Sequence, residues 1–246
     1  MKSQLNPSVE TMLSTPGRRI LFVHVGKCAG ESILTHLYHH LGEEFSVFEM
    51  HVYESNVLIE QVLSQHADSF DILIAKRSPI ERFVSAFNWD KHNLHLAQLA
   101  SREKRLNYDR WFETMPTVND LGLALGSADP ELQKMAVQFS RFAHMGCGQA
   151  WYTPLSLLQR VPPDRIKVID VATISSDLKR FLSAVLGYPP QSKAPLLHTK
   201  GDYQNLYENG DALFPKTLSA DARRNLEERL AEDFEVYEWL NGTQPR

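Results

Sequence analysis

Short apolar runs alternate along this chain with longer stretches in which apolar residues recur every three or four positions. The continuous runs at 20–25 and 71–75 are typical of strands buried on both faces. Residues 165–169 predict another strand, and 45–52 alternate well enough for a short one. Because strands alternate with helical segments, we predict an α/β fold: a single domain with a central, mainly parallel sheet flanked by helices.

Helical spacing marks the segments between and after these runs. Pro79 stands where a first helical turn tolerates proline, Gly187 is placed to end a helix, and Ser219 is placed to cap one. The predicted helices are 31–41, 56–66, a helix from Pro79 through Phe87, 131–145, 176–186 and 219–240.

Two parts of the chain fit this alternation poorly. Residues 1–17 are polar, contain Pro7 and Pro16 and lack the apolar core of a signal peptide, so we expect a flexible leader there. Residues 18–246 then form the domain. Within it, about 88–130 is weakly periodic, as insertions that form lids or acceptor sites often are.

Composition restricts the classes of partner. The chain has 246 residues and a net charge of −4, which argues against nucleic acid and gives no support for docking on anionic lipid. No run is long and apolar enough for a membrane span. The two cysteines, Cys28 and Cys147, form no disulfide framework, so we expect a reducing, cytoplasmic compartment. The oligomeric state is left open.

A phosphate-sized loop follows the first apolar run. The sequence Gly26-Lys-Cys-Ala-Gly-Glu-Ser32 lies between a predicted strand and a predicted helix, where backbone N–H groups and the helix dipole attract an anion. Lys27 adds a positive charge and Ser32 a hydroxyl. The loop is not a Walker A motif, because its lysine directly follows the first glycine and no Lys-Ser/Thr pair closes it.

A second anion signal follows the strand at 71–75. Arg77 stands at the strand end, where open α/β sheets bind ligands, and its planar fork suits a phosphate. Ser85 lies eight residues later within the predicted helix. Taken alone, each residue is better explained by a structural role: Arg77 as a partner of a carbonyl or surface carboxylate, and Ser85 as a solvated helix residue.

Together these segments resemble sulfotransferases that use PAPS (3′-phosphoadenosine 5′-phosphosulfate), in the carbohydrate sulfotransferase branch. The loop at 24–32 is similar to the family pattern H-x-P-K-T-G-G-T-S. The segment at 77–87 is similar to R-D-P-x-E-R-F-x-S-x-Y. This chain differs at Gly26, Cys28, Ala29 and Ser78, but it keeps Lys27, Ser32, Arg77 and Ser85.

The resemblance implies a P-loop-like sulfotransferase fold and transfer of a sulfuryl group from PAPS to an acceptor hydroxyl, with a carbohydrate as one possible acceptor and no metal required. Lys27 would stabilise the leaving phosphate, and Arg77 with Ser85 would hold the 3′ phosphate. Lys200 follows a proline-rich turn and either closes over the nucleotide or belongs to a plain surface loop. The expected PAPS-binding residues are Gly26, Lys27, Cys28, Ala29, Gly30, Glu31, Ser32, Arg77, Ser85 and Lys200.

An acceptor hydroxyl also needs a general base. His51 is our first choice, because the unperturbed pKa of histidine lies near neutral pH and because it follows a predicted strand between the two phosphate signals. A structural role for His51 is an equal alternative, and Glu31 and Glu49 are other candidate bases. His24 is expected to pack and hydrogen-bond near the loop.

Other readings of the chain stay open. A P-loop-type small-molecule kinase would need Mg²⁺ and a Walker loop, and a non-catalytic nucleotide-binding protein would keep the fold with a decayed site. The histidines at 36, 39, 40, 92 and 95 lack obvious partner ligands for zinc. The aromatic residues Trp89, Trp111, Trp151 and Tyr152 most simply belong to the core, and Trp111 could stack on a sugar if it lies on a lid.

Overall fold

The computed structural model describes residues 4–52, 54–97, 102–190 and 202–242. The chain forms two compact units, which are described separately. The first unit draws on 1–77, 149–199 and 235–246, and the second on 78–148 and 200–234. Neither unit is one continuous segment.

The first unit is built on a sheet that, in the described part of the chain, has five strands, all parallel. The order across the sheet is β1-β3-β2-β4-β5. The strands are β1 (Gln4–Leu5), β2 (Arg18–Val23), β3 (Phe45–Met50), β4 (Asp71–Lys76) and β5 (Ile166–Asp170). The predicted α/β class is confirmed.

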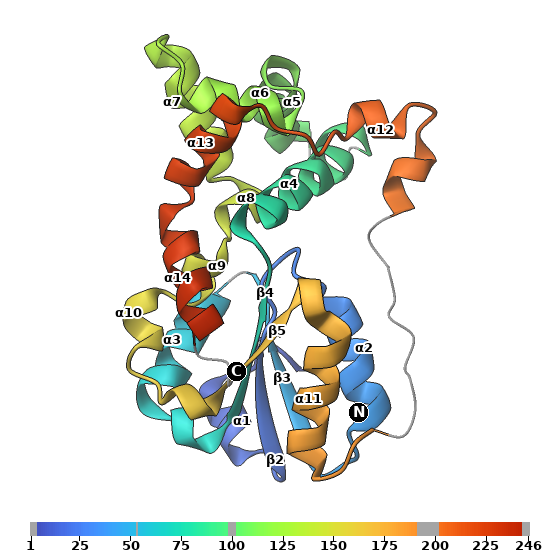
Figure 1. Ribbon diagram of the computed structural model, residues 1–246, viewed down its shortest axis with the longest axis vertical. Coiled ribbons are helices and arrows are strands. Elements are labelled where there is room, and N and C mark those ends of the chain that lie inside the picture. The colour runs from blue at the N-terminus through green and yellow to red at the C-terminus, as the bar shows by residue number, and fades with distance from the viewer. Residues whose placement is uncertain (1–3, 53, 98–101, 191–201, 243–246) are drawn as a thin grey trace. The chain divides into compact units, whose positions relative to one another are not determined.

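Helices cover both faces of this sheet. Figure 1 shows α2 and α11 on one face and α1 and α3 on the other. The helices of this unit are α1 (Val9–Ser14), α2 (Gly30–His40), α3 (Ser55–Gln65), α9 (Gln149–Tyr152), α10 (Leu155–Leu158) and α11 (Ile174–Leu186). Short 3₁₀ turns lie at Ala67–Ser69, Pro163–Arg165 and Val171–Thr173. As predicted, α11 ends at Gly187, whose φ of 79° is left-handed and suits glycine.

The segment expected to be a flexible leader contributes instead to the first unit. Within it, β1 pairs with β3, and α1 begins at a cap where the Ser8 hydroxyl accepts from the Thr11 amide. Met12 on α1 is fully buried. Burial of this apolar side chain stabilises the folded segment, an effect that the polar composition of residues 1–17 does not reveal. One domain with an insertion at about 88–130 stays a prediction.

The second unit is helical where it is described. Its core contains Phe83, Phe87, Phe112 and Phe139. The helices are α4 (Pro79–Asp90), a π-helix (Lys91–Leu96), α5 (Arg102–Thr114), α6 (Val118–Leu125), α7 (Pro130–Ser140), α8 (Ala143–Gly146), a 3₁₀ turn (Asp202–Leu206), α12 (Gly210–Leu213) and α13 (Ala220–Arg229). A last helix, α14 (Ala231–Gly242), begins in this unit and ends in the first.

Two predicted helices are each divided in two. The helix expected at 131–145 is broken between α7 and α8, where Phe142 is extended and Ala143 has a φ of 46°. The helix expected at 219–240 is broken at Leu230, which has φ −104° and ψ 18°. Apolar spacing continues through both breaks because Phe142 and Leu230 still pack against the core of the second unit. Ser219 does cap α13, as predicted.

Candidate functional site

Three neighbouring strands of the first unit end at the same edge of the sheet. Val23 of β2 is in register with Met50 of β3 and with Ile74 of β4. The residues that follow these strands therefore leave the sheet side by side: the loop from 24, His51, and Arg77. The carboxyl ends of parallel strands are where α/β sheets bind ligands.

The loop after β2 turns sharply into α2. Lys27 and Ala29 both have left-handed backbones, with φ values of 69° and 57°. Ala29 is the N-cap of α2, and its methyl side chain cannot cap the helix. The first-turn amides of α2, from Gly30 to Ser32, therefore point toward the loop as a helix N-terminus that suits an anion. Lys27 is half-buried beside them, and Ser32 is buried.

Position 30 must be a glycine because the His24 ring lies against its backbone. A Cβ atom at Gly30 would lie 1.9 Å from Cδ2 of the His24 ring and 2.0 Å from its Nε2. His24 Nδ1 hydrogen-bonds Oε1 of Glu49 at 2.6 Å, which fixes the ring against the loop. His24 therefore packs and hydrogen-bonds near the loop, as predicted. Glu49, considered above as a base, is the partner of His24.

His51 stacks on His24, with ring centroids 3.9 Å apart and an angle of 15° between the planes. Its Nδ1 lies 2.8 Å from the carbonyl oxygen of His24. A carbonyl only accepts, so Nδ1 carries the proton, and in the neutral ring Nε2 has the lone pair. This tautomer can take a proton at Nε2.

Asn6 holds the backbone of His51 in place. Its side-chain amide donates to the carbonyl oxygens of His51 at 3.0 Å and of Val52 at 3.3 Å, and its Oδ1 accepts from the His51 amide at 3.0 Å. The Tyr152 hydroxyl accepts from the Val52 amide at 3.2 Å and lies 3.4 Å from His51 Nδ1. Neither residue could be recognised from the sequence as part of this site. Neither belongs to a motif, and Asn6 lies 45 residues before its partner.

The end of β4 presents two cations with different surroundings. Lys76 is buried, and its ammonium lies 2.8 Å from Oδ2 of Asp170 on β5. It also donates to the amide oxygen of Asn241 and lies over the ring of Tyr237, both on α14. Arg77 follows and is half-buried. Lys76 thus has a structural role, while Arg77 follows it at the edge of the sheet where the loop after β2 and His51 also lie.

Two other residues predicted to bind PAPS, Ser85 and Lys200, do not belong to the described part of the first unit. Ser85 is half-buried on α4, in the second unit. Its pairing with Arg77 stays a prediction. Lys200 lies outside the described residues.

The second unit has its own cluster of titratable side chains next to the π-helix. The Tyr203 ring stacks on His92 with centroids 5.0 Å apart, and Nδ1 of His92 lies 2.9 Å from the Tyr207 hydroxyl. Burial lowers the pKa of His92 and raises the pKa of Tyr203 to about 12. Both groups are therefore neutral at pH 7. A π-helix often marks a functional segment, and His92 lies both in this π-helix and within the predicted acceptor insertion.

Within the described residues, no group of three or more His, Cys, Asp and Glu side chains could hold a metal ion. No described helix is long and apolar enough to cross a membrane.

Comparison with known proteins identifies a family for this chain. The model of the sulfotransferase family matches residues 10–239, which is most of the chain. A search of curated proteins found no significant match.

Proposed function

This chain belongs to the sulfotransferase family, which uses PAPS as its sulfuryl donor, and from that premise we propose that it transfers the sulfuryl group to a hydroxyl of a carbohydrate. The observation that carries this proposal is the shared strand register. It brings the loop after β2, His51 and Arg77 to one edge of the sheet. An anion cradle, an imidazole and a guanidinium thus follow adjacent strands.

The loop supplies the groups that hold the donor. The amides of Gly30, Glu31 and Ser32 lie at a helix N-terminus, so they suit the 5′ phosphate. The loop Gly26-Lys27-Cys28-Ala29 forms the turn before them, and the Lys27 ammonium stabilises the charge that develops on the leaving phosphate. We assign the 3′ phosphate to Arg77 and Ser85, with Lys200 as a further contact to the nucleotide.

His51 accepts the acceptor's proton. As the acceptor oxygen bonds to sulfur, the bond from sulfur to the bridging phosphate oxygen breaks, and the hydroxyl proton passes to His51 Nε2. The hydrogen bond from Nδ1 to the His24 carbonyl stabilises the imidazolium that results. In such an in-line transfer the protein acts mainly by positioning groups and stabilising charge.

Binding of PAP, the product nucleotide, tests the donor site. Calorimetry without metal compares PAP with ADP and AMP on the same sample. We expect PAP to bind at least ~10-fold more tightly, or roughly 1.4 kcal/mol, because only PAP carries a 3′ phosphate. Equal or tighter binding of ADP, especially with Mg²⁺, would contradict the proposal and favour a kinase.

A transfer assay tests the acceptor class. Radiolabelled PAPS is incubated with neutral and acidic oligosaccharides, and with phenols and a tyrosine peptide as controls. Label that enters only the saccharides supports the carbohydrate assignment. Label that enters only the controls would contradict it while leaving the donor assignment intact.

A further inference from the structure

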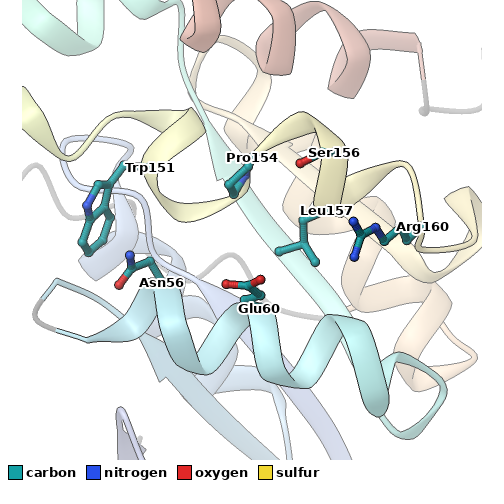
Figure 2. A pocket seen from close by; sticks show the side chains of 7 residues that line it. All are labelled: Asn56, Glu60, Trp151, Pro154, Ser156, Leu157 and Arg160. Carbon is teal, nitrogen blue, oxygen red and sulfur yellow. The ribbon is translucent and has the colours of Figure 1, made fainter.

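The first unit has a hollow of about 120 Å³ beside the candidate site but outside its donor residues. It lies between α3 and the short helices α9 and α10 (Figure 2). Its lining includes Asn56, Glu60, Trp151, Ser156, Leu157 and Arg160. Trp151 was expected in the core, but it is only half-buried and faces this hollow.

Helix α9 connects the hollow to His51. Its residue Tyr152 is buried and places its hydroxyl 3.4 Å from His51 Nδ1. The preceding residue, Trp151, meets the Tyr152 ring edge to face at 4.7 Å. Of two consecutive side chains on one short helix, Tyr152 thus contacts the candidate base and Trp151 lines the hollow. The hollow therefore adjoins the helix that supports the candidate base.

The lining suits one sugar ring. The indole of Trp151 offers an aromatic face for the C–H side of a sugar, and Leu157 forms a buried apolar floor. Asn56 and Glu60 are one turn apart on α3 and present an amide and a carboxylate that can hydrogen-bond hydroxyls (Figure 2). Sites for drug-sized ligands are about 300–1,000 Å³. This smaller hollow fits a single ring better than a nucleotide.

Arg160 indicates the charge of the ligand. It is the cation among the lining residues and lies at the opposite end of the hollow from Trp151 (Figure 2). A guanidinium forms paired, parallel hydrogen bonds with a carboxylate or a sulfate. A sugar that stacks on Trp151 can thus place an anionic substituent toward Arg160.

We propose that this hollow binds the sugar next to the one being sulfated, and that Arg160 recognises a carboxylate or sulfate on that neighbouring sugar. The inference rests on the proposed carbohydrate sulfotransferase activity and specifies its substrate class. The acceptor is therefore an acidic oligosaccharide of at least two sugars, rather than a single neutral sugar.

Steady-state kinetics of Trp151→Ala and Arg160→Gln test the proposal. The acceptors are an oligosaccharide with uronate groups and the same oligosaccharide with these groups reduced to alcohols. Arg160→Gln should raise KM for the acidic acceptor about tenfold and leave KM for the reduced one unchanged. Trp151→Ala should raise KM for both acceptors, because stacking does not depend on the charge.

Matched controls separate binding from folding. Arg165→Gln removes an exposed arginine that pairs with Asp68 outside the hollow, so its kinetics should equal those of the parent chain. All variants should keep the parent's PAP affinity and melting temperature. If Arg160→Gln changes KM no more than Arg165→Gln does, the proposal is wrong even when the parent sulfates saccharides. If the parent binds PAP but sulfates no saccharide, both the carbohydrate assignment and this inference fail.

Discussion

The side chain of His51 is oriented by its neighbours before any substrate arrives. The His24 carbonyl selects the proton on Nδ1, the stacked His24 ring fixes the plane, and Asn6 fixes the backbone. A base whose tautomer and position are fixed in advance loses little entropy on reaching the transition state. His51 is therefore better suited to proton transfer than Glu49, which is engaged with His24.

We expect His51→Ala to lower kcat by about 10²–10⁴-fold, the usual range for general acid–base catalysis, with PAP affinity near that of the parent. Asn6→Ala should lower kcat by a smaller factor, because it frees the backbone of His51 but keeps the imidazole. The kcat of Asn6→Asp should lie between that of Asn6→Ala and that of the parent, since the aspartate carboxylate still accepts from the His51 amide. Parental kcat in His51→Ala would exclude His51 as the base.

Arg77 gives a second prediction at the scale of one residue. Arg77→Ala should weaken binding of PAP and leave adenosine 5′-phosphosulfate, which has no 3′ phosphate, little affected. Loss of a charged hydrogen-bonding pair costs about 1.5–3 kcal/mol, so the Kd for PAP should rise by about 10- to 150-fold. Titration calorimetry with the two ligands measures the difference. An equal loss for both would contradict the assignment of Arg77 to the 3′ phosphate.

Some residues of the candidate site could be identified from the sequence around them, and others could not. Lys27 and Arg77 could be identified because each follows an apolar run that reads as a buried strand. Asn6 could not, because an asparagine near a proline is an ordinary turn signal and its partner is distant in sequence. Its role depends on the pairing of β1 with β3. Strand β1 has only two residues, which is too short to produce a sequence pattern.

At the scale of an element, the turn from β2 into α2 joins the anion cradle to the candidate base. Gly30 allows the His24 ring to lie against the helix start, and His24 in turn supports His51. A change at this one backbone position therefore affects both halves of the site.

Gly30→Ala tests this linkage. The added methyl would overlap the His24 ring, so we expect a loss of about 1–3 kcal/mol of stability, which is typical of overpacking. We also expect lower turnover, because His51 loses its stacking partner. Gly242→Ala is the control, since nothing lies within 4 Å of its added Cβ. Urea unfolding and kcat measure the two effects. Normal kcat in a destabilised Gly30→Ala variant would show that His24 does not position His51.

Elements were predictable where packing and local pattern agree. The strands and the helices α2, α3, α4 and α11 follow their apolar spacing because each buries one continuous face. The breaks at Ala143 and Leu230 could not be predicted, since they change the backbone while the side chains on either side stay in the core. Periodicity records which residues are buried but not whether the helix is continuous between them.

At the scale of the whole molecule, the sheet could be predicted from the sequence, but the contacts between the sheet and the C-terminal helix α14 could not. Lys76 joins β4 to β5 through Asp170 and to α14 through Asn241 and Tyr237. These partners lie as many as 165 residues away in sequence. Lys76 carries the same charge as Arg77 and precedes it directly in the sequence, and only the fold reveals that Lys76 is buried among structural partners.

Lys76→Met should therefore destabilise the protein without acting on the donor site. Removing one partner of a buried ion pair costs about 3–5 kcal/mol, because the remaining charge stays buried without compensation. The double variant Lys76→Met, Asp170→Asn should recover much of that loss, since it removes the second charge as well. Arg165→Ala, which breaks an exposed pair with Asp68 at 3.7 Å, should cost no more than about 1 kcal/mol. Urea unfolding of the four proteins gives the comparison. If the double variant is no more stable than Lys76→Met, the lysine acts through its packing on Tyr237 and not through charge, and the end of α14 is held to the sheet by that aromatic contact.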